Sequence, residues 1–311
     1  MDATCKLLRR LERPHACVDA VLDTDAYNEV DDQFAIAYLL RAGDRTRAKA
    51  LYAAPFYASF NPNSTDPEDG MLKSYDEIRK VVSLAGQEEM LPQVFHGSRR
   101  FLPDEKTPVD SPAARDLAVR AMAYTEDAPL YVLSIGAITN VASALLMNPA
   151  IRDRVVIVWL GGHAFHWPDT FAFNMFQDIA AARVVMDSGA AVVHLPCMGV
   201  TDALKTTQPE LRAWLQGRNA LCDYLCENTI AEAERNAPGK PWSRVIWDVS
   251  AVAWLVDWEG RMVQDTLVPA PIPEYDYHYS HSFRRHPIRQ AWSIDRDAVF
   301  DDLFTRLRQE G

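Results

Sequence analysis

The chain lacks any apolar run long enough to cross a bilayer, and residues 1–17, MDATCKLLRRLERPHAC, lack the apolar core of a secretion signal. It also lacks a surplus of basic residues: the net charge is −11, which argues against binding to nucleic acid or to an anionic membrane. Its five cysteines, an odd number without the paired spacing of a disulfide framework, indicate reduced thiols. We therefore expect a cytoplasmic protein whose partner is a small molecule, with no nucleic-acid or membrane partner.

Repeats and low-complexity tracts are also missing. The composition, 48% hydrophobic and 24% charged, is that of an ordinary globular protein. Because 311 residues are enough to bury one large core, we expect a single domain over residues 1–311, with residues 1–16 as an N-terminal extension. Cys222 and Cys226 lie four positions apart on an expected helix, and we interpret them as packing residues rather than metal ligands.

Short apolar segments alternate with segments of helical periodicity along the chain. This alternation predicts an α/β fold with a mainly parallel sheet, helices on both faces and a ligand site beyond the carboxyl ends of the strands. The expected strands are residues 18–22, 48–54, 130–135, 155–160 and 191–195. The expected helices are residues 71–84, 111–124, 139–147, 179–187 and 211–233, and the expected irregular segments are residues 61–70 and 269–287.

Four aspartates fall within ten residues where the first expected strand ends and a helix begins: Asp23, Asp25, Asp31 and Asp32. A lone aspartate at such a place is typical of a helix N-cap. Four carboxylates repel one another unless a positive charge lies between them, and oxygen ligands in this number suit Ca²⁺ or Mg²⁺ far better than zinc. The sequence therefore predicts a hard-cation site on this loop and the first helical turn.

Three further motifs follow the aspartate cluster: LYVLSIGAITNVASALL, GGHAFHWPDTFAFNMFQDIAAARVVMDSG and WDVSAVAWLVD. In order and spacing the four motifs, which span residues 18–257, resemble the calcium-dependent nucleoside hydrolases of the inosine-uridine type. The resemblance implies a Rossmann-like single domain, assembled as a homodimer or homotetramer. It also implies an enzyme that uses Ca²⁺ to hydrolyse the N-glycosidic bond of a ribonucleoside or related N-riboside. The alternatives are hydrolysis of a non-standard ribose-containing compound, or metal-dependent binding of a ribose or nucleoside without catalysis.

The same resemblance implies roles for individual residues. The metal ligands that it implies are Asp25, Asp32, Asp248 and the backbone carbonyl of Ile135. Asp25 is also the implied catalytic base, placed to take a proton from a calcium-bound water. Asp31 and Asn174 match residues that bind the ribose, and Asp23 is expected behind the cluster as a hydrogen-bond acceptor. Asp248 by itself would be typical of a helix N-cap.

Several positions depart from the family's pattern and predict a rebuilt pocket. Residues 26–30 separate Asp25 from Asp31, where a shorter connection is usual. Ala172 stands where a glutamate contacts the sugar, and Trp247 stands where many members carry a histidine that protonates the leaving base. We therefore expect a flat leaving group held by stacking. Besides Asp31 and Asn174, the expected substrate contacts are Tyr27, Glu29, Phe56, His166 and Trp247.

Two questions stay open at this level. The group that protonates the leaving base is not assigned, and the candidates are His163, His166, His278, His281 and His286. DTDAY also matches superficially the DxD motif of haloacid-dehalogenase-type phosphatases. Tyr27 stands where those enzymes need threonine or valine, and no convincing lysine and later acidic pair follow, which makes this the weaker interpretation.

Overall fold

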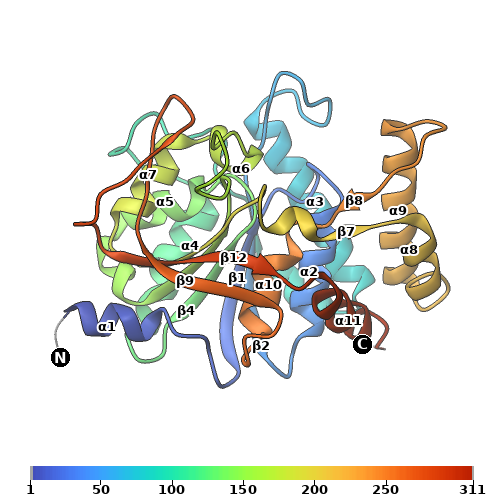
Figure 1. Cartoon of the computed structure of the whole chain (residues 1–311), viewed down its shortest axis with the longest axis horizontal. Coiled ribbons are helices and arrows are strands. Elements are labelled where there is room, and N and C mark those ends of the chain that lie inside the picture. The colour runs from blue at the N-terminus through green and yellow to red at the C-terminus, as the bar shows by residue number, and fades with distance from the viewer. Residues whose placement is uncertain (1–2, 310–311) are drawn as a thin grey trace.

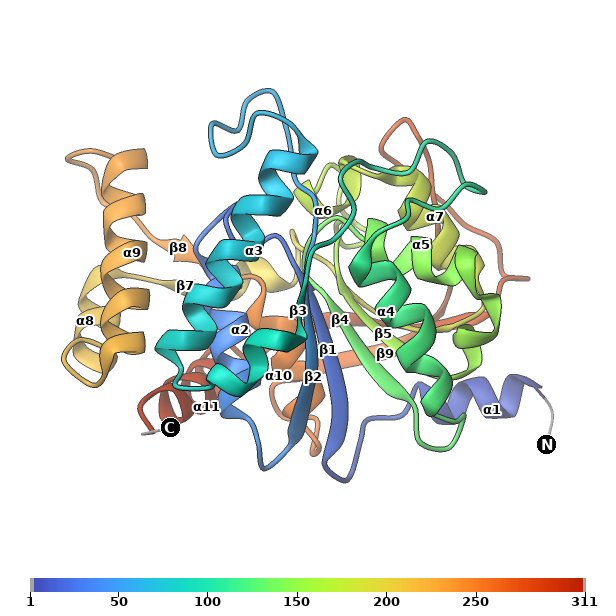
Figure 2. The same ribbon diagram turned by 180° about the vertical axis from the view of Figure 1, so that it is seen from behind.

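A central β-sheet with helices on both of its faces makes up the computed structural model, which describes residues 3–309 (Figures 1 and 2). Neighbouring strands are parallel except at one edge, where the last two pair antiparallel. In spatial order the eight strands are β3 (Val94–Phe95), β2 (Thr46–Ala53), β1 (Val18–Thr24), β4 (Leu130–Ser134), β5 (Val155–Leu160), β6 (Ala191–Leu195), β12 (Pro287–Ile294) and β9 (Val263–Pro269). The expected α/β class and mainly parallel sheet are confirmed.

The central strands are apolar because helices cover both of their faces. Every residue of β4, β5 and β6 is buried. One face is covered by α2 (Asp31–Arg41), α3 (Pro67–Leu84), α10 (Val249–Val256) and α11 (Arg296–Leu307), and α9 (Ala220–Asn236) packs against α2 and α3 farther from the sheet (Figures 1 and 2). The other face is covered by α4 (Pro112–Arg120), α5 (Thr139–Met147) and α7 (Ile179–Asp187). Among the described helices, none is long and apolar enough to span a membrane.

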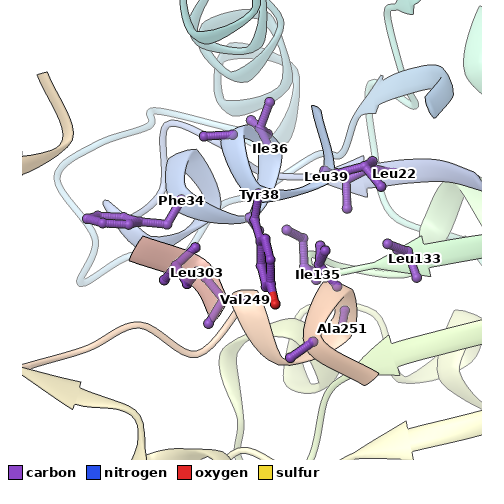
Figure 3. Packing of buried hydrophobic residues seen from close by; sticks show 14 of the residues in the cluster. Leu22, Phe34, Ile36, Tyr38, Leu39, Leu133, Ile135, Val249, Ala251 and Leu303 are labelled. Atoms are coloured by element: carbon purple, nitrogen blue, oxygen red, sulfur yellow. The ribbon is translucent and has the colours of Figure 1, made fainter. Parts of the chain in front are cut away.

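The packing of α2 against α10 positions the start of both helices. In Figure 3, Tyr38 of α2 lies close to Val249 and Ala251 of α10, and both helices rest on the strands that carry Leu22 and Leu133. All five of these side chains are fully buried. Burial of a valine or leucine side chain contributes roughly 1.5–3 kcal/mol, so this packing stabilises the relative position of the two helices.

The N-terminal segment also packs against the domain. Helix α1 (Ala3–Arg10) is followed by Leu11, which is fully buried in the same core as α2 and α10. Arg13 then forms ion pairs with Asp257 and Asp265, the latter at 2.7 Å. Residues 3–16 thus contact the domain through apolar packing and buried charge pairs.

Three sequence expectations need correction. The helix expected over residues 211–233 is two helices, α8 (Gln208–Trp214) and α9, because Gly217 adopts a φ of 73° and Asn219 caps the second helix. Helix α3 begins at Pro67, inside the segment expected to be irregular, because Asp66 accepts a hydrogen bond from the backbone N–H of Asp69.

The third correction concerns the C-terminal strands. The expected irregular segment 269–287 contains a small hairpin of β10 (Ile272–Pro273) and β11 (Tyr279–Ser280), and it is flanked by β9 and β12. Strand β9 is half exposed and interrupted by polar residues, so it lacks the apolar run that marks a buried strand. The remaining short elements are α6 (Phe173–Phe176), β7 (Lys205–Thr206), β8 (Arg244–Val245) and four 3₁₀ turns, Glu88–Gln93, Ala121–Ala123, Pro149–Asp153 and Thr201–Ala203.

Candidate active site and metal centre

A pocket of about 310 Å³ opens at the carboxyl ends of the central strands. Segments that follow β1, β4, β5 and β6 contribute its walls, together with the residues just before α10. This is the position expected for a ligand site in a parallel α/β sheet. One end of the pocket carries carboxylates and the other carries aromatic side chains and a histidine.

Three buried carboxylates converge at the acidic end. Oxygens of Asp31, Asp32 and Asp248 all lie within 4.8 Å of one another. Asp31 and Asp32 occupy the first turn of α2, and Asp248 directly precedes α10, so the packing of these helices brings the carboxylates together. Within the described chain the Asp248 side chain makes no capping hydrogen bond. The N-cap interpretation therefore does not account for this residue.

Asp25 lies in the same pocket and is equally buried. Its Oδ2 atom has no hydrogen-bond partner among residues 3–309. Gly136 makes this position accessible, because a Cβ built there would lie 2.9 Å from Asp25 Oδ1. Burial, followed by repulsion from Asp32, raises the pKa of Asp25 well above its usual range. An unpaired buried carboxylate is costly, and a bound cation would remove that cost.

The other carboxylates show the same electrostatic strain. Burial and the neighbouring Glu29 raise the pKa of Asp31, and burial together with Asp31 raises the pKa of Asp248. Burial raises the pKa of Asp32 to about 7, although Thr24 donates a hydrogen bond to it. A set of buried oxygen donors that repel one another fits a hard divalent cation.

Asp23 lies behind the acidic cluster and is held in place by hydrogen bonds from two residues. Asp23 accepts hydrogen bonds from Asn140 Nδ2 at 2.8 Å and from Ser134 Oγ at 3.2 Å. Burial raises the pKa of Asp23 to about 7, despite these two hydrogen bonds. This placement agrees with the supporting position expected for Asp23.

Asn174 is placed on the carbonyl groups at the strand ends. Its Nδ2 donates to the Ile135 carbonyl oxygen at 2.8 Å and to the Leu160 carbonyl oxygen at 3.1 Å. A carbonyl oxygen has two lone pairs, so Ile135 retains acceptor capacity beyond this hydrogen bond. Asn174 therefore orients one of the expected metal ligands and lines the pocket itself.

The structure divides the other expected substrate contacts into two groups. Glu29 and Trp247 line the pocket, and the Trp247 backbone N–H donates to Asp31 Oδ2 at 3.1 Å. Tyr27, Phe56 and His166 lie outside it. Phe56 is fully buried against Gly70, while Tyr27 and His166 are exposed. Side chains alternate between the two faces of a sheet only within a strand, and this pattern ends where the loop begins. The sequence therefore does not show which of these three side chains face the pocket.

Of the five candidate histidines, all within the described chain, only His163 lines the pocket. Its Nδ1 lies 3.2 Å from the Met198 backbone nitrogen and 3.1 Å from the Gly162 carbonyl oxygen, so this nitrogen has a hydrogen-bond partner in either tautomer of the neutral ring. Nε2 lies 3.7 Å from Asp169 Oδ1. Burial lowers the pKa of His163, so the ring is neutral near pH 7.

Two aromatic residues that sequence reasoning missed also line the pocket, Phe171 and Phe173. Phe171 stacks on Phe176 with ring centroids 4.5 Å apart and meets the edge of Tyr277 at 4.9 Å. The alternating FAFN segment, in which two phenylalanines share a side, was the available signal.

A mainly parallel sheet with a buried carboxylate cluster at its carboxyl edge defines an α/β protein with an acidic site that could hold a metal ion beside a small-molecule pocket. Residues 20–301 match the sequence model of the inosine-uridine preferring nucleoside hydrolases, and the chain belongs to that family. This membership excludes the phosphatase interpretation of DTDAY.

Individual relatives are distant. The chain is 26% identical over 170 residues to the inosine-uridine preferring nucleoside hydrolase of Leishmania major, covering 52% of each protein. It is 27% identical over 164 residues to the non-specific ribonucleoside hydrolase RihC of Escherichia coli, covering 50% of each. The alignments thus span about half the length of these curated relatives.

Solved structures resemble the fold over nearly the whole chain. The plant nucleoside hydrolase PpNRh1 superposes with a TM-score of 0.73 at 17% identity, covering 94% of this chain and 99% of that one. The purine-preferring ribonucleoside hydrolase from Gardnerella vaginalis gives a TM-score of 0.73 at 20% identity, covering 93% and 98%. The type III effector XopQ, solved with adenosine diphosphate ribose, gives 0.67 at 16%, covering 99% and 98%. At these identities the likeness shows the fold alone.

Proposed function

We propose that the chain hydrolyses the N-glycosidic bond of a ribonucleoside or related N-riboside, with Ca²⁺ held by Asp25, Asp32, Asp248 and the Ile135 carbonyl. The observation that carries the proposal is the unpartnered, buried Oδ2 of Asp25 beside three converging carboxylates. Family membership supports the reaction class. A divalent cation bound at these oxygens supplies an activated water and a grip on the ribose hydroxyls.

The carboxylates match the charge that the reaction develops. Departure of the base leaves a positively charged, oxocarbenium-like sugar, which nearby negative charge stabilises. Asp31 receives the Trp247 N–H on Oδ2, so its other oxygen is available to the ribose diol. Asp25 serves as the general base, because its carboxylate is held in the pocket next to the acidic cluster.

The opposite end of the pocket suits a flat leaving group. Trp247, Phe171 and Phe173 offer aromatic surface, and His163 offers an imidazole ring. A neutral imidazole donates a hydrogen bond readily but a full proton poorly. We therefore propose weak turnover of inosine and uridine, and faster turnover of an N-riboside whose leaving group departs without strong acid assistance.

Release of reducing sugar tests the reaction. The panel should contain inosine, uridine, p-nitrophenyl riboside, an O-riboside whose nitrophenolate leaves without protonation, and adenosine diphosphate ribose, the ligand named for the XopQ structure. Because adenosine diphosphate ribose already has a reducing ribose end, its cleavage is followed instead as release of free adenine. Asp25→Asn should lower kcat by about 10²–10⁴-fold, the usual contribution of a general base, and still bind ligand. Asp276→Asn, at an exposed position outside the pocket, is the matched control.

Two results would contradict the proposal. One is the absence of sugar release across the panel at saturating Ca²⁺ while ligand still binds, which would indicate a non-catalytic binding protein. The other is equal activity of Asp25→Asn and the wild type, which would assign the base elsewhere.

The assembly and the compartment are separate parts of the proposal. We propose a homodimer or homotetramer in the cytoplasm, as family resemblance and the reduced cysteines support. Light scattering on the purified chain measures the assembly, and a monomer at micromolar concentration would contradict it.

A further inference from the structure

The charged residues that line the main pocket all carry the same sign. Five of the described lining residues are carboxylates, and none is lysine or arginine; the carboxylates are Asp25, Glu29, Asp31, Asp32 and Asp248. Arg244 reaches Glu29 at 3.1 Å from outside the lining. When all five are ionised, a divalent cation would balance two of these charges and Arg244 one, which leaves two. The pocket therefore attracts a positively charged ligand and repels an anionic one.

The aromatic end of the pocket offers ring surfaces to such a cation. Trp247, Phe171 and Phe173 line this end. Phe171 is 46% exposed and is held by stacking on Phe176, with ring centroids 4.5 Å apart. Within the described chain, no lysine or arginine lies over any of the three lining rings. A cationic ligand at this end would gain cation–π attraction, which is strongest over tryptophan.

The same end has no strong acid among its described lining residues. His163 is the histidine of this lining, and burial lowers its pKa, so its ring is neutral near pH 7. A neutral imidazole does not repel a cationic ring, and it protonates a departing anion poorly. A leaving group that is positively charged while bound needs no proton, because it departs as a neutral molecule.

We propose that the substrate is an N-riboside of a cationic heteroaromatic ring of the pyridinium type. Its ring lies among Trp247, Phe171 and Phe173, and its ribose lies at the carboxylates. The inference rests on the proposed hydrolase function and names the substrate class of the same site.

The charge in this reaction moves in the direction that the pocket favours. Water bonds to C1′, the C1′–N bond breaks, and the electron pair of that bond neutralises the ring nitrogen. The proton of the water passes to Asp25, and the products are ribose and an uncharged base. Positive charge thus moves from the aromatic end toward the acidic end, where the carboxylates stabilise it.

A pair of ribosides separates recognition of charge from reactivity of the bond. Nicotinamide riboside is the cationic probe. Benzamide riboside, in which carbon replaces the ring nitrogen, is its neutral isostere and is not cleaved at this bond. Calorimetry with Asp25→Asn, which should bind without turnover, should give at least about fivefold tighter binding of nicotinamide riboside. Raising the salt from about 0.05 to 0.5 M should remove most of this difference, because salt screens the attraction between charges.

Phe171→Leu, made together with Asp25→Asn, tests the aromatic contact by the same calorimetry. It should weaken binding of nicotinamide riboside about two- to fivefold, the usual effect of one cation–π contact at a partly exposed position, and weaken binding of benzamide riboside less. Phe171→Tyr retains a ring and should retain the affinity. Phe283→Leu, which is 96% exposed and outside the pocket, is the matched control.

Turnover by the wild type completes the test. The kcat/KM for nicotinamide riboside should exceed that for inosine at least about tenfold, since proton transfer to a departing base is worth about 10²–10⁴-fold where a general acid supplies it. Equal binding of the two probes at low salt, or inosine turnover equal to that of nicotinamide riboside, would overturn the inference. Cleavage of inosine or p-nitrophenyl riboside would then leave the proposed function standing, whereas no cleavage of any riboside would overturn both.

Discussion

The side-chain amide of Asn174 joins the ends of two neighbouring strands by donating to the carbonyl of Ile135 at 2.8 Å and to the carbonyl of Leu160 at 3.1 Å. One of these carbonyls belongs to an expected metal ligand. Asn174, at the start of α6, therefore fixes the orientation of the Ile135 carbonyl. A group that orients a metal ligand in this way contributes measurably to metal affinity.

Asn174→Ala should weaken Ca²⁺ binding by about 10- to 100-fold, the usual cost of losing a group that orients a ligand. Titration calorimetry measures the change. Asn148→Ala is the matched control, since Asn148 also donates to a backbone carbonyl, that of Ala118, at a site remote from the pocket. Unchanged Ca²⁺ affinity in Asn174→Ala would remove the Ile135 carbonyl from the ligand set.

Gly136→Ala should displace Asp25, because the added Cβ would lie 2.9 Å from Asp25 Oδ1 and 3.0 Å from Ala54 Cβ. We expect kcat to fall at least about tenfold, with a loss of about 1–3 kcal/mol in unfolding free energy from overpacking. Gly43→Ala is the control, since in the described structure no atom lies within 4 Å of a Cβ built there. Full activity in Gly136→Ala would show that Asp25 tolerates displacement and is not the base.

Asp32→Asn should raise the melting temperature of the metal-free protein and abolish the further rise on adding Ca²⁺. The substitution removes one of several mutually repelling buried charges, and asparagine can still accept the hydrogen bond from Thr24. Differential scanning fluorimetry with and without Ca²⁺ is the measurement, and Asp301→Asn, at an exposed position of α11, is the control. A Ca²⁺-dependent shift equal to that of the wild type would refute the metal assignment.

Trp247→Ala should slow inosine cleavage much more than cleavage of p-nitrophenyl riboside, because stacking helps only a leaving group that needs stabilisation. Loss of an aromatic contact of this kind is worth about 0.5–1.5 kcal/mol beyond the area buried. Trp292→Ala, at an exposed position outside the pocket, is the control. Equal slowing of both substrates would show that Trp247 only supports the loop before Asp248.

We expect the buried His194 to make the free energy of unfolding depend on pH. Burial lowers its pKa to about 4, below the value of about 6.5 for an unfolded histidine. Between these values the unfolded state binds more protons, so stability rises with pH, and lowering the pH from 7 to 5 should cost about 2 kcal/mol through this group.

Urea unfolding at the two pH values measures the effect. His194→Gln should be less stable at pH 7 but should lose less on acidification than the wild type. His15→Gln, at an exposed position, should lose as much as the wild type. If acidification destabilises His194→Gln and the wild type equally, the buried imidazole does not titrate as the structure implies.

Some of the described strands were predicted from the sequence and others were not. Strands β1, β4, β5 and β6 were predicted within a few residues because each is a short, mostly apolar segment in a sheet that helices cover on both faces. Strand β9 escaped prediction because its exposed edge position tolerates polar residues, which erase that pattern.

The α/β class, the family motifs and the aspartate loop could be recognised from the amino-acid sequence alone, because each depends on the pattern of residues that are close together in the chain. Which distant side chains come into contact depends on how the helices and strands pack together. Trp247 and Asp31 are 216 positions apart yet hydrogen-bonded, since α2 and α10 pack through buried apolar side chains. Phe56 likewise lies outside the pocket, whereas Phe171 and His163 line it. Residue type and spacing do not reveal such long-range contacts, which form only when the whole chain has folded.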